Sequence, residues 1–511
     1  MKKSTCYLFG ILLIGISFLG ISCAKVSLDK LSQELLPVEG NPLVNLRIIL
    51  KAGSAHDPAG KEGLCQLTLS LLANGGSKSM TFKEIQKKFY PMAAAVGVQV
   101  DKEMSVFTGQ VHRDNLEKYY EILKDMLLNP GFREDDFNRI KTNQSNFLEK
   151  TLVGNWDEQF GKEILNLMLY EAHPYGHNEA GTVEALKNIT TDDLKAFYKE
   201  HFLQGNITIG LAGGYPFDFP SKVMKDFSGL PEGHTPQLNL PEPRKSDGLE
   251  IFIAEKKTPA TAISMGFHVP INRADSAFFP LWIAGSHFGE HRQHVSLLFQ
   301  KIREERGQNY GDYAYIEHFI QGRDKFPATN YCRRQQYFSI WIRPLANSNR
   351  HFVIRQALYE LKKLVEEGTP EEKFKLVQKY LYNYTKLYAQ TLGERLGWQS
   401  DSHYYGYEDF LVEAQNRFQK LTRDNVNKAV KKYLNYKNIY IAIITDDAEA
   451  LRKALVENTP SPIKYANPNM PKIVLEEDLI YQLFPLEVKP EKVKIALATE
   501  FFQKAGLPKS K

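Results

Sequence analysis

Polar and apolar residues follow one plan twice along this chain. Alternating apolar positions predict strands, and apolar positions three to four residues apart predict helices. Glycines at Gly75 and Gly76 predict the end of the first of these helices. In the first half the predicted strands are 43–55, 96–111 and the end of 197–214, and the predicted helices are 63–76, 81–89, 115–132 and a stretch that opens at 133–140.

The second half repeats this order of strands and helices. Its predicted strands are 261–270, 310–319, 335–345 and the end of 426–447, and its predicted helices are 274–289, 295–307, 352–370 and 371–381. A plan that occurs twice over roughly two hundred residues predicts two similar domains. We therefore expect an α+β protein built from two tandem homologous α/β-sandwich domains.

A stretch rich in proline and charge, 230–248, separates the two copies and is typical of a linker. The first domain is placed at residues 24–235, the linker at 236–250 and the second domain at 251–460. A tail at 461–511 follows, in which a strand or two are expected to pack on the body. The length of 511 residues also favours more than one domain.

Composition excludes some classes of function. The chain is 43% hydrophobic and 24% charged, with a formal charge of +5, and basic residues alternate with acidic ones. This small net charge, made up of both signs, does not indicate a nucleic-acid-binding surface, because such surfaces usually contain a basic patch.

The first 23 residues differ from this average. Lys2 and Lys3 precede an apolar run that ends at Ile21, and Ser22 and Cys23 follow. A basic start, an apolar middle and a small residue before the cut are typical of a secretory signal. Cys23 is similar to the lipidated cysteine of bacterial lipoproteins. We expect an exported protein of the periplasm or cell envelope, anchored by lipid at Cys23, with an ordinary signal peptide as the alternative.

Two cysteines remain in the body, Cys65 and Cys332. An oxidising compartment would permit a bridge between them, although two cysteines do not form a disulfide framework.

One short motif suggests metal chemistry. His287, Glu290 and His291 spell H-x-x-E-H, in which two imidazoles hold zinc and the glutamate activates a water. Gly289 lies inside the motif, and by the internal repeat the motif falls where the first half has a helix end. Glycine there predicts a C-cap, so we expect a turn and keep zinc binding as the rival reading, with His294 as a third ligand.

Three segments carry a resemblance to a known family. They are 51–64, 173–190 and 300–311. Together they resemble the pitrilysin/insulinase family of zinc metallopeptidases. That resemblance implies two homologous domains that form a clamshell around a peptide, with H-x-x-E-H on a helix of the first domain.

In this chain the implied motif is degenerate. Gln66 and Ser70 stand in the histidine positions and Leu69 stands in the glutamate position. Zinc prefers imidazole, thiolate or carboxylate ligands, so no catalytic residue and no metal ligand are expected here. The third-ligand position falls on Phe147 by one alignment and on Glu149 by another.

The second domain lacks the third metal ligand in the position that the internal repeat implies, but it matches another feature of the family. The third-ligand position there falls on Tyr384 or Lys386, with acidic residues nearby at 366–367 and 371–372. Arg303 and Tyr310 have the spacing of the Arg/Tyr pair with which the family binds substrate. A guanidinium can hold a peptide carbonyl and a phenol can donate to an oxyanion.

The resemblance therefore implies a non-catalytic, peptide-binding subunit of an exported peptidase. Arg303 and Tyr310 would serve the active site of a homologous partner subunit, which would hold the zinc, and this chain would bind no cofactor. A homodimer is the alternative assembly. Two rival functions stay open: a stand-alone pseudo-peptidase that binds peptides or acts as a scaffold, and an active zinc peptidase that uses His287, Glu290 and His291.

Overall fold

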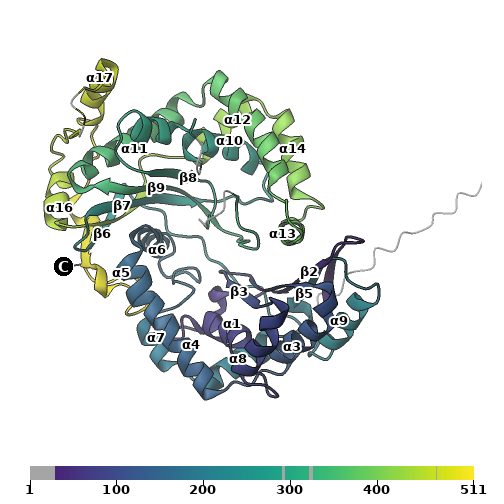
Figure 1. Ribbon diagram of the computed structural model, residues 1–511. Helices are drawn as coiled ribbons and strands as arrows, with labels where there is room; N and C mark the ends of the chain where they lie inside the picture. Colours follow the sequence, from purple (N-terminus) through teal and green to yellow (C-terminus); the bar gives the residue numbers. More distant parts are fainter. Residues whose placement is uncertain (1–28, 291–293, 321–325, 466, 468, 511) are drawn as a thin grey trace, which may run out of the picture.

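The computed structural model describes residues 29–290, 294–320, 326–465, 467 and 469–510. Two mixed sheets face the middle of the molecule, and helices cover the outer face of each (Figure 1). This is the predicted α+β arrangement of two similar halves. In the part of the chain described, no helix is long and apolar enough to cross a membrane.

The first sheet has five strands in the order β1-β5-β2-β4-β3. Strand β1 is parallel to β5, and the other pairs are antiparallel. The strands are β1 (Ser32–Pro37), β2 (Leu43–Leu50), β3 (Val96–Val100), β4 (Ser105–His112) and β5 (Ile207–Gly213). The helices of this half are α1 (Leu64–Asn74), α2 (Phe82–Phe89), α3 (Leu116–Leu128), α4 (Glu134–Asn146), α5 (Val153–Asn155), α6 (Asp157–Leu169), α7 (Val183–Asn188), α8 (Thr191–His201) and α9 (Phe219–Phe227).

The second sheet has six strands in the order β11-β6-β10-β7-β9-β8. The strands are β6 (Leu249–Glu255), β7 (Ala260–Val269), β8 (Gly311–Tyr315), β9 (Gln336–Ala346), β10 (Ile439–Thr445) and β11 (Val493–Leu497). The helices of this half are α10 (Phe278–Gly289), α11 (Arg350–Glu367), α12 (Glu371–Tyr384), α13 (Leu392–Tyr404), α14 (Phe410–Lys420), α15 (Arg423–Tyr433), α16 (Ala448–Val456) and α17 (Lys472–Tyr481).

One helix of each half packs on the sheet of the other half. Helix α6 packs on β7 and β10 of the second sheet, and α13 packs on β5 and β1 of the first sheet. Glu34 on β1 accepts hydrogen bonds from Ser400 and from His403 on α13. The two halves therefore share their cores, which the repeat in the sequence does not reveal.

The tail corrects one prediction. Most of the segment expected to form strands folds as α17, and among the tail residues that the structure describes only β11 extends a sheet, in parallel with β6. Beyond β11, the carbonyl oxygen of Phe502 accepts from the Val183 nitrogen at 2.8 Å. The Phe501 ring contacts Phe160 of α6 with centroids 5.4 Å apart. The tail thus joins the second sheet to the first half.

Two segments wind more widely than an α-helix. Phe147–Leu152 and Phe299–Glu304 are π-helices, closed by bonds such as that from the Glu305 nitrogen to the Gln300 oxygen at 2.9 Å. Short π-helices occur often at functional sites. The first contains both candidates for the third-ligand position of the first half, Phe147 and Glu149, and the second contains Arg303.

Candidate functional site

Helix α1 is held in place by its first turn. Gly63 precedes it with φ 97°, a backbone conformation that favours glycine. The carboxylate of Asp57 accepts from the nitrogens of Gly63 and Cys65, both at 2.7 Å. This satisfies backbone donors that a helix start leaves free, and the negative charge suits that end of the helix. The face of α1 that carries the degenerate motif is therefore fixed.

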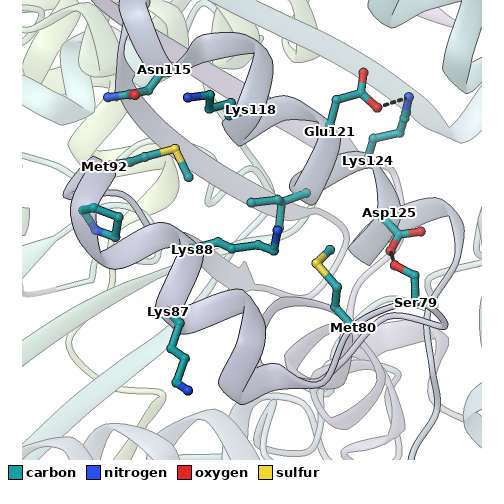
Figure 2. A pocket seen from close by; sticks show the side chains of 12 residues that line it. Ser79, Met80, Lys87, Lys88, Met92, Asn115, Lys118, Glu121, Lys124 and Asp125 are labelled. Carbon is teal, nitrogen blue, oxygen red and sulfur yellow. Dashed lines mark hydrogen bonds and ion pairs between the residues drawn. The ribbon is translucent and has the colours of Figure 1, made fainter.

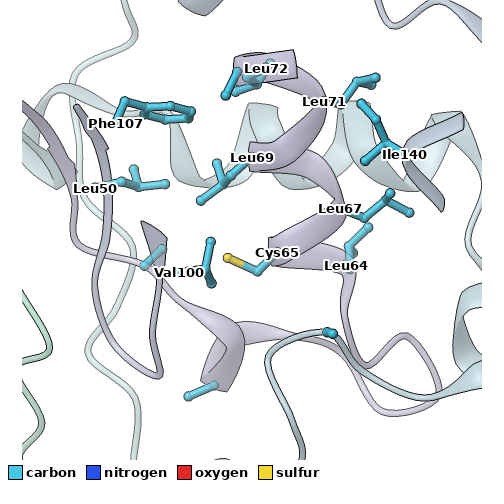
Figure 3. Close-up of a cluster of buried hydrophobic side chains, with 14 of the residues drawn as sticks. Leu50, Leu64, Cys65, Leu67, Leu69, Leu71, Leu72, Val100, Phe107 and Ile140 are labelled. Atoms are coloured by element: carbon cyan, nitrogen blue, oxygen red, sulfur yellow. The ribbon is translucent and has the colours of Figure 1, made fainter. Parts of the chain in front are cut away.

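The degenerate motif divides between a cavity and the core. Gln66 and Ser70 line a cavity of about 590 Å³, where the Gln66 Nε2 donates to the Ser70 Oγ at 2.7 Å. Leu69 is 0% exposed and lies in the core of the first half with Leu50 and Phe107 (Figure 3). An amide and a hydroxyl are poor zinc ligands, and Leu69 cannot accept a proton from water.

The structure separates the two candidates for the third-ligand position. Phe147 lines the same cavity as Gln66 and Ser70. Glu149 is exposed and is not part of that lining. The position nearest the motif is thus held by a phenyl ring, which offers a metal no ligand atom. Gln66, Ser70 and Phe147 together do not fit zinc.

The remaining walls of the cavity come from both halves. The first half adds Asp101 and Glu179, and the second half adds His318, Ile320 and Tyr331. Sequence analysis did not predict these residues as parts of the site. The sequence pattern predicts a strand that includes His318 but does not indicate that this segment reaches the first half, so only the three-dimensional structure places these residues here.

One buried ion pair joins the two halves at the wall of this cavity, and a second lies within the first half. The Arg333 Nε donates to Asp101 at 2.9 Å, and both side chains are almost fully buried. The Lys102 Nζ lies 2.8 Å from Glu179. Despite burial, which acts against it, the neighbouring Asp101 and Glu179 hold the pKa of Arg333 well above its usual value. Such pairs fix geometry more than they add stability.

His287 and Glu290 of the H-x-x-E-H motif lie at the end of α10, as predicted. His287 is 5% exposed, and burial, with Lys373 adding to it, lowers its pKa to about 4. Glu290 follows the last helical residue in an extended conformation, φ −63° and ψ 148°, so the motif does not continue on one helix. Burial raises the pKa of Glu290 to about 7. His291 lies outside the described residues.

Gly289 differs from its expected role. It is the last residue of α10 rather than a left-handed cap, and the cap position belongs to Glu290. A Cβ at Gly289 would lie 3.0 Å from the backbone nitrogen of Ala314 on β8. The glycine is therefore required by the close approach of α10 to β8.

The other candidate ligands of the second half are dispersed. His294 is exposed and its ring packs on Phe299, with centroids 4.8 Å apart. The ring of Tyr384 packs on Tyr388. Glu366 accepts from the Tyr436 hydroxyl at 2.6 Å. Over residues 29–510 apart from the undescribed gaps, no three His, Cys, Asp or Glu side chains group in a way that could hold a metal.

Arg303 and Tyr310 are in contact with each other. The Arg303 Nη1 donates to the Tyr310 carbonyl oxygen at 3.0 Å, and its guanidinium carbon lies 4.5 Å from the centre of the Tyr310 ring. The ring of Phe299 supports the same guanidinium at 4.7 Å. Tyr310 is 66% exposed. Neither residue lines the cavity of Gln66 and Ser70.

The two cysteines of the body are not bridged. Cys65 is a buried thiol on α1, and Cys332 is a buried thiol that donates to Asp401 at 3.3 Å. They lie in separate hydrophobic clusters. Burial raises the pKa of both thiols well above the usual value, which disfavours the reactive thiolate.

A second hollow lies on the outer face of the first half. It has a volume of about 870 Å³ and is lined from α2 and α3 by Lys87, Lys88, Lys118 and Lys124 among other residues (Figure 2). Glu121 and Asp125 lie in the same lining and offset part of this charge. The hollow has no residue in common with the degenerate motif.

Comparison with known proteins agrees with this geometry. The sequence profile of "Insulinase (Peptidase family M16)" matches residues 37–174, and that of "Peptidase M16 inactive domain" matches residues 188–381. The chain belongs to the M16 insulinase family. The domain assigned to its second half is one that the family description itself calls inactive.

Relatives within the M16 family are described both as a non-peptidase homologue and as zinc proteases. "Non-peptidase homolog YmxG" of Helicobacter pylori is 21% identical over 417 residues, which is 79% of this chain and 89% of that protein. "Uncharacterized zinc protease YmxG" of Bacillus subtilis is 22% identical and covers 54% of this chain and 66% of its own length. An M16 inactive domain from Pseudomonas fluorescens has the same fold, with a TM-score of 0.70 and 20% identity over 82% of this chain and 96% of that one. These findings support an inactive peptidase homologue.

Proposed function

We propose that this M16 chain is the non-catalytic, peptide-binding subunit of an exported zinc metallopeptidase. A homologous partner subunit would hold the zinc, and Arg303 and Tyr310 would reach the partner's active site. The chain would be anchored to the cell envelope through a lipid on Cys23.

One contrast carries the proposal. The residues that would hold zinc are replaced by Gln66, Ser70 and Phe147, all of which face one cavity. The Arg/Tyr pair is retained, and its two members contact each other. A chain that loses its own metal site but keeps a substrate-binding pair is suited to completing a site that another chain begins.

The chemistry of the pair fits this role. The Arg303 guanidinium is stacked between two rings, so it is held in a defined direction and can donate to the carbonyl oxygen of a peptide. The Tyr310 side chain is exposed, so its hydroxyl is accessible as a donor to charge that develops on a peptide carbonyl. The zinc that activates water would come from the partner.

A stand-alone peptide-binding protein is the second candidate. It is favoured by the cavity of about 590 Å³, which this chain closes with residues of its own two halves. In that case peptide binding would need no partner and no proteolysis would follow.

The test uses the chain together with a homologue that has an intact H-x-x-E-H, encoded beside it. The mixture should cleave peptides that neither chain cleaves alone. Arg303→Ala should lower kcat/KM of the mixture by roughly a hundredfold, the usual scale for loss of one transition-state contact. Arg452→Ala, at a partly exposed arginine of α16, is the matched control and should leave the rate unchanged. An inert mixture, or equal rates for the two variants, would refute the role of the pair.

A further inference from the structure

The cavity beside Gln66 and Ser70 contains three carboxylates, of which two are paired. Asp101 is bound by Arg333, and Glu179 is bound by Lys102. Glu163, on α6, is the third. Among the residues the structure describes, no Lys, Arg or His nitrogen forms an ion pair with Glu163 within 4.0 Å.

The hydrogen bonds of Glu163 are neutral. Its carboxylate accepts from the Gln159 Nε2 at 2.8 Å and from the side chain of Asn178. The next residue along the chain, Lys162, pairs instead with Glu158 at 2.8 Å and lies over the Trp341 ring. Amide donors offset part of the cost of a partly buried carboxylate, but they do not neutralise its charge.

Burial and the neighbouring charge of Glu179 raise the pKa of Glu163, although the charge of Lys102 and the two amide donors offset part of this rise. Both effects disfavour the ionised carboxylate, and both would be relieved by a cation that entered the cavity. The rest of the lining suits such a group. Gln66 uses its amide nitrogen on Ser70, which leaves its amide oxygen for a donor. Trp156 adds an aromatic surface that can contact a cation.

We infer that this cavity binds a cationic nitrogen of a peptide, with Glu163 as its counter-ion. The nitrogen would be either the free ammonium of the peptide's N-terminus or the end of a lysine or arginine side chain. The inference rests on the proposed peptide-binding function and names the chemistry that the peptide must bring. Glu163 would thus set specificity at a position where no cationic side chain of the described residues forms an ion pair with it.

Isothermal titration of the whole chain tests this without any partner. The probes are one short peptide in four forms, with a free or an acetylated N-terminus and with lysine or glutamine at its basic positions. The form that is neutral at both places should bind at least about tenfold more weakly, which corresponds to about 1.4 kcal/mol. The two intermediate forms identify which nitrogen is bound.

Two variants assign the effect to one side chain. Glu163→Gln keeps the shape and removes the charge, so it should bind all four forms with the weaker affinity. Glu149→Gln, at an exposed glutamate outside the cavity, is the matched control and should keep the wild-type preference. Glu163→Asp keeps the charge and serves as a second variant if Glu163→Gln does not fold.

The outcomes separate the inference from the function on which it rests. Equal affinity for the charged and neutral forms would overturn the inference and leave peptide binding intact. A preference for charge that persists in Glu163→Gln would also overturn it. Failure of every form to bind would overturn both the inference and the peptide-binding function.

Discussion

Helices α1 and α10 occupy corresponding places in the two halves but present opposite kinds of surface. Each packs near the edge strand of its sheet, α1 near β3 and α10 near β8. One face of α1 opens to a cavity, whereas α10 is buried along almost its whole length, because α12, α14 and α15 cover it. The sequence that better matches a zinc motif begins on α10, whose His287 lines none of the cavities described above.

This difference shows that a ligand-binding motif needs side chains on a face of the helix that a ligand can reach. His287 fits the spelling, but it is enclosed in protein, and Glu290 has left the helix. Gln66 and Ser70 do not fit the spelling, but they line a cavity. We therefore expect the cavity face of α1 to bind a ligand, and we expect the residues at the end of α10 to have a structural role.

The largest expected effect comes from restoring the glutamate of the motif. Leu69→Glu would place a charge in the core of the first half, because Leu69 is fully buried. We expect a loss of about 3–5 kcal/mol in the free energy of unfolding, typical of an unpaired buried charge, measured by urea denaturation. Gln66→Glu puts the same charge on the cavity face of the same helix and should cost less than about 1 kcal/mol. Similar costs for the two would show that α1 does not separate core from cavity.

A smaller, pH-dependent effect is expected at His287. Its folded pKa of about 4 lies below the usual 6.5, so the unfolded chain takes up a proton first as the pH falls. Its contribution to stability is thus fully present above pH 6.5 and is lost as the pH falls from 6.5 towards 4. His287→Leu should abolish this loss, which is roughly 3 kcal/mol. Parallel pH profiles of unfolding for variant and wild type would contradict the burial of this imidazole.

The smallest effect is expected at Ser70. Ser70→Ala removes the hydrogen bond from Gln66, but both side chains border the cavity and Gln66 can turn to water there. The loss in the free energy of unfolding should therefore stay below about 1 kcal/mol. A loss of several kcal/mol by the same denaturation assay would mean that the Gln66–Ser70 pair is part of the core.

The sequence predicts the elements better than their assembly. Alternation placed β2, β4, β7 and β9, because one face of each strand is buried in its own half. It could not assign α6 and α13, since an apolar face shows that a helix is covered but not which sheet covers it. The exchange of these two helices depends on contacts between residues far apart in the chain.

The same limit applies to the site. Gln66, Ser70 and the pair of Arg303 and Tyr310 could be found because a resemblance supplies their positions. Glu163 could not, since a glutamate on an amphipathic helix is typically read as solvated. Its place in the cavity depends on the second-half loop of His318 and Tyr331, which closes over the first half.

The zinc content of the purified chain, after equilibration with excess zinc and desalting, tests the central claim most directly. A chain without a metal site should retain far less than one zinc, and His287→Ala and His291→Ala should leave that amount unchanged. One zinc per chain that is lost in His291→Ala would contradict the account, because it would move the metal chemistry to the end of α10.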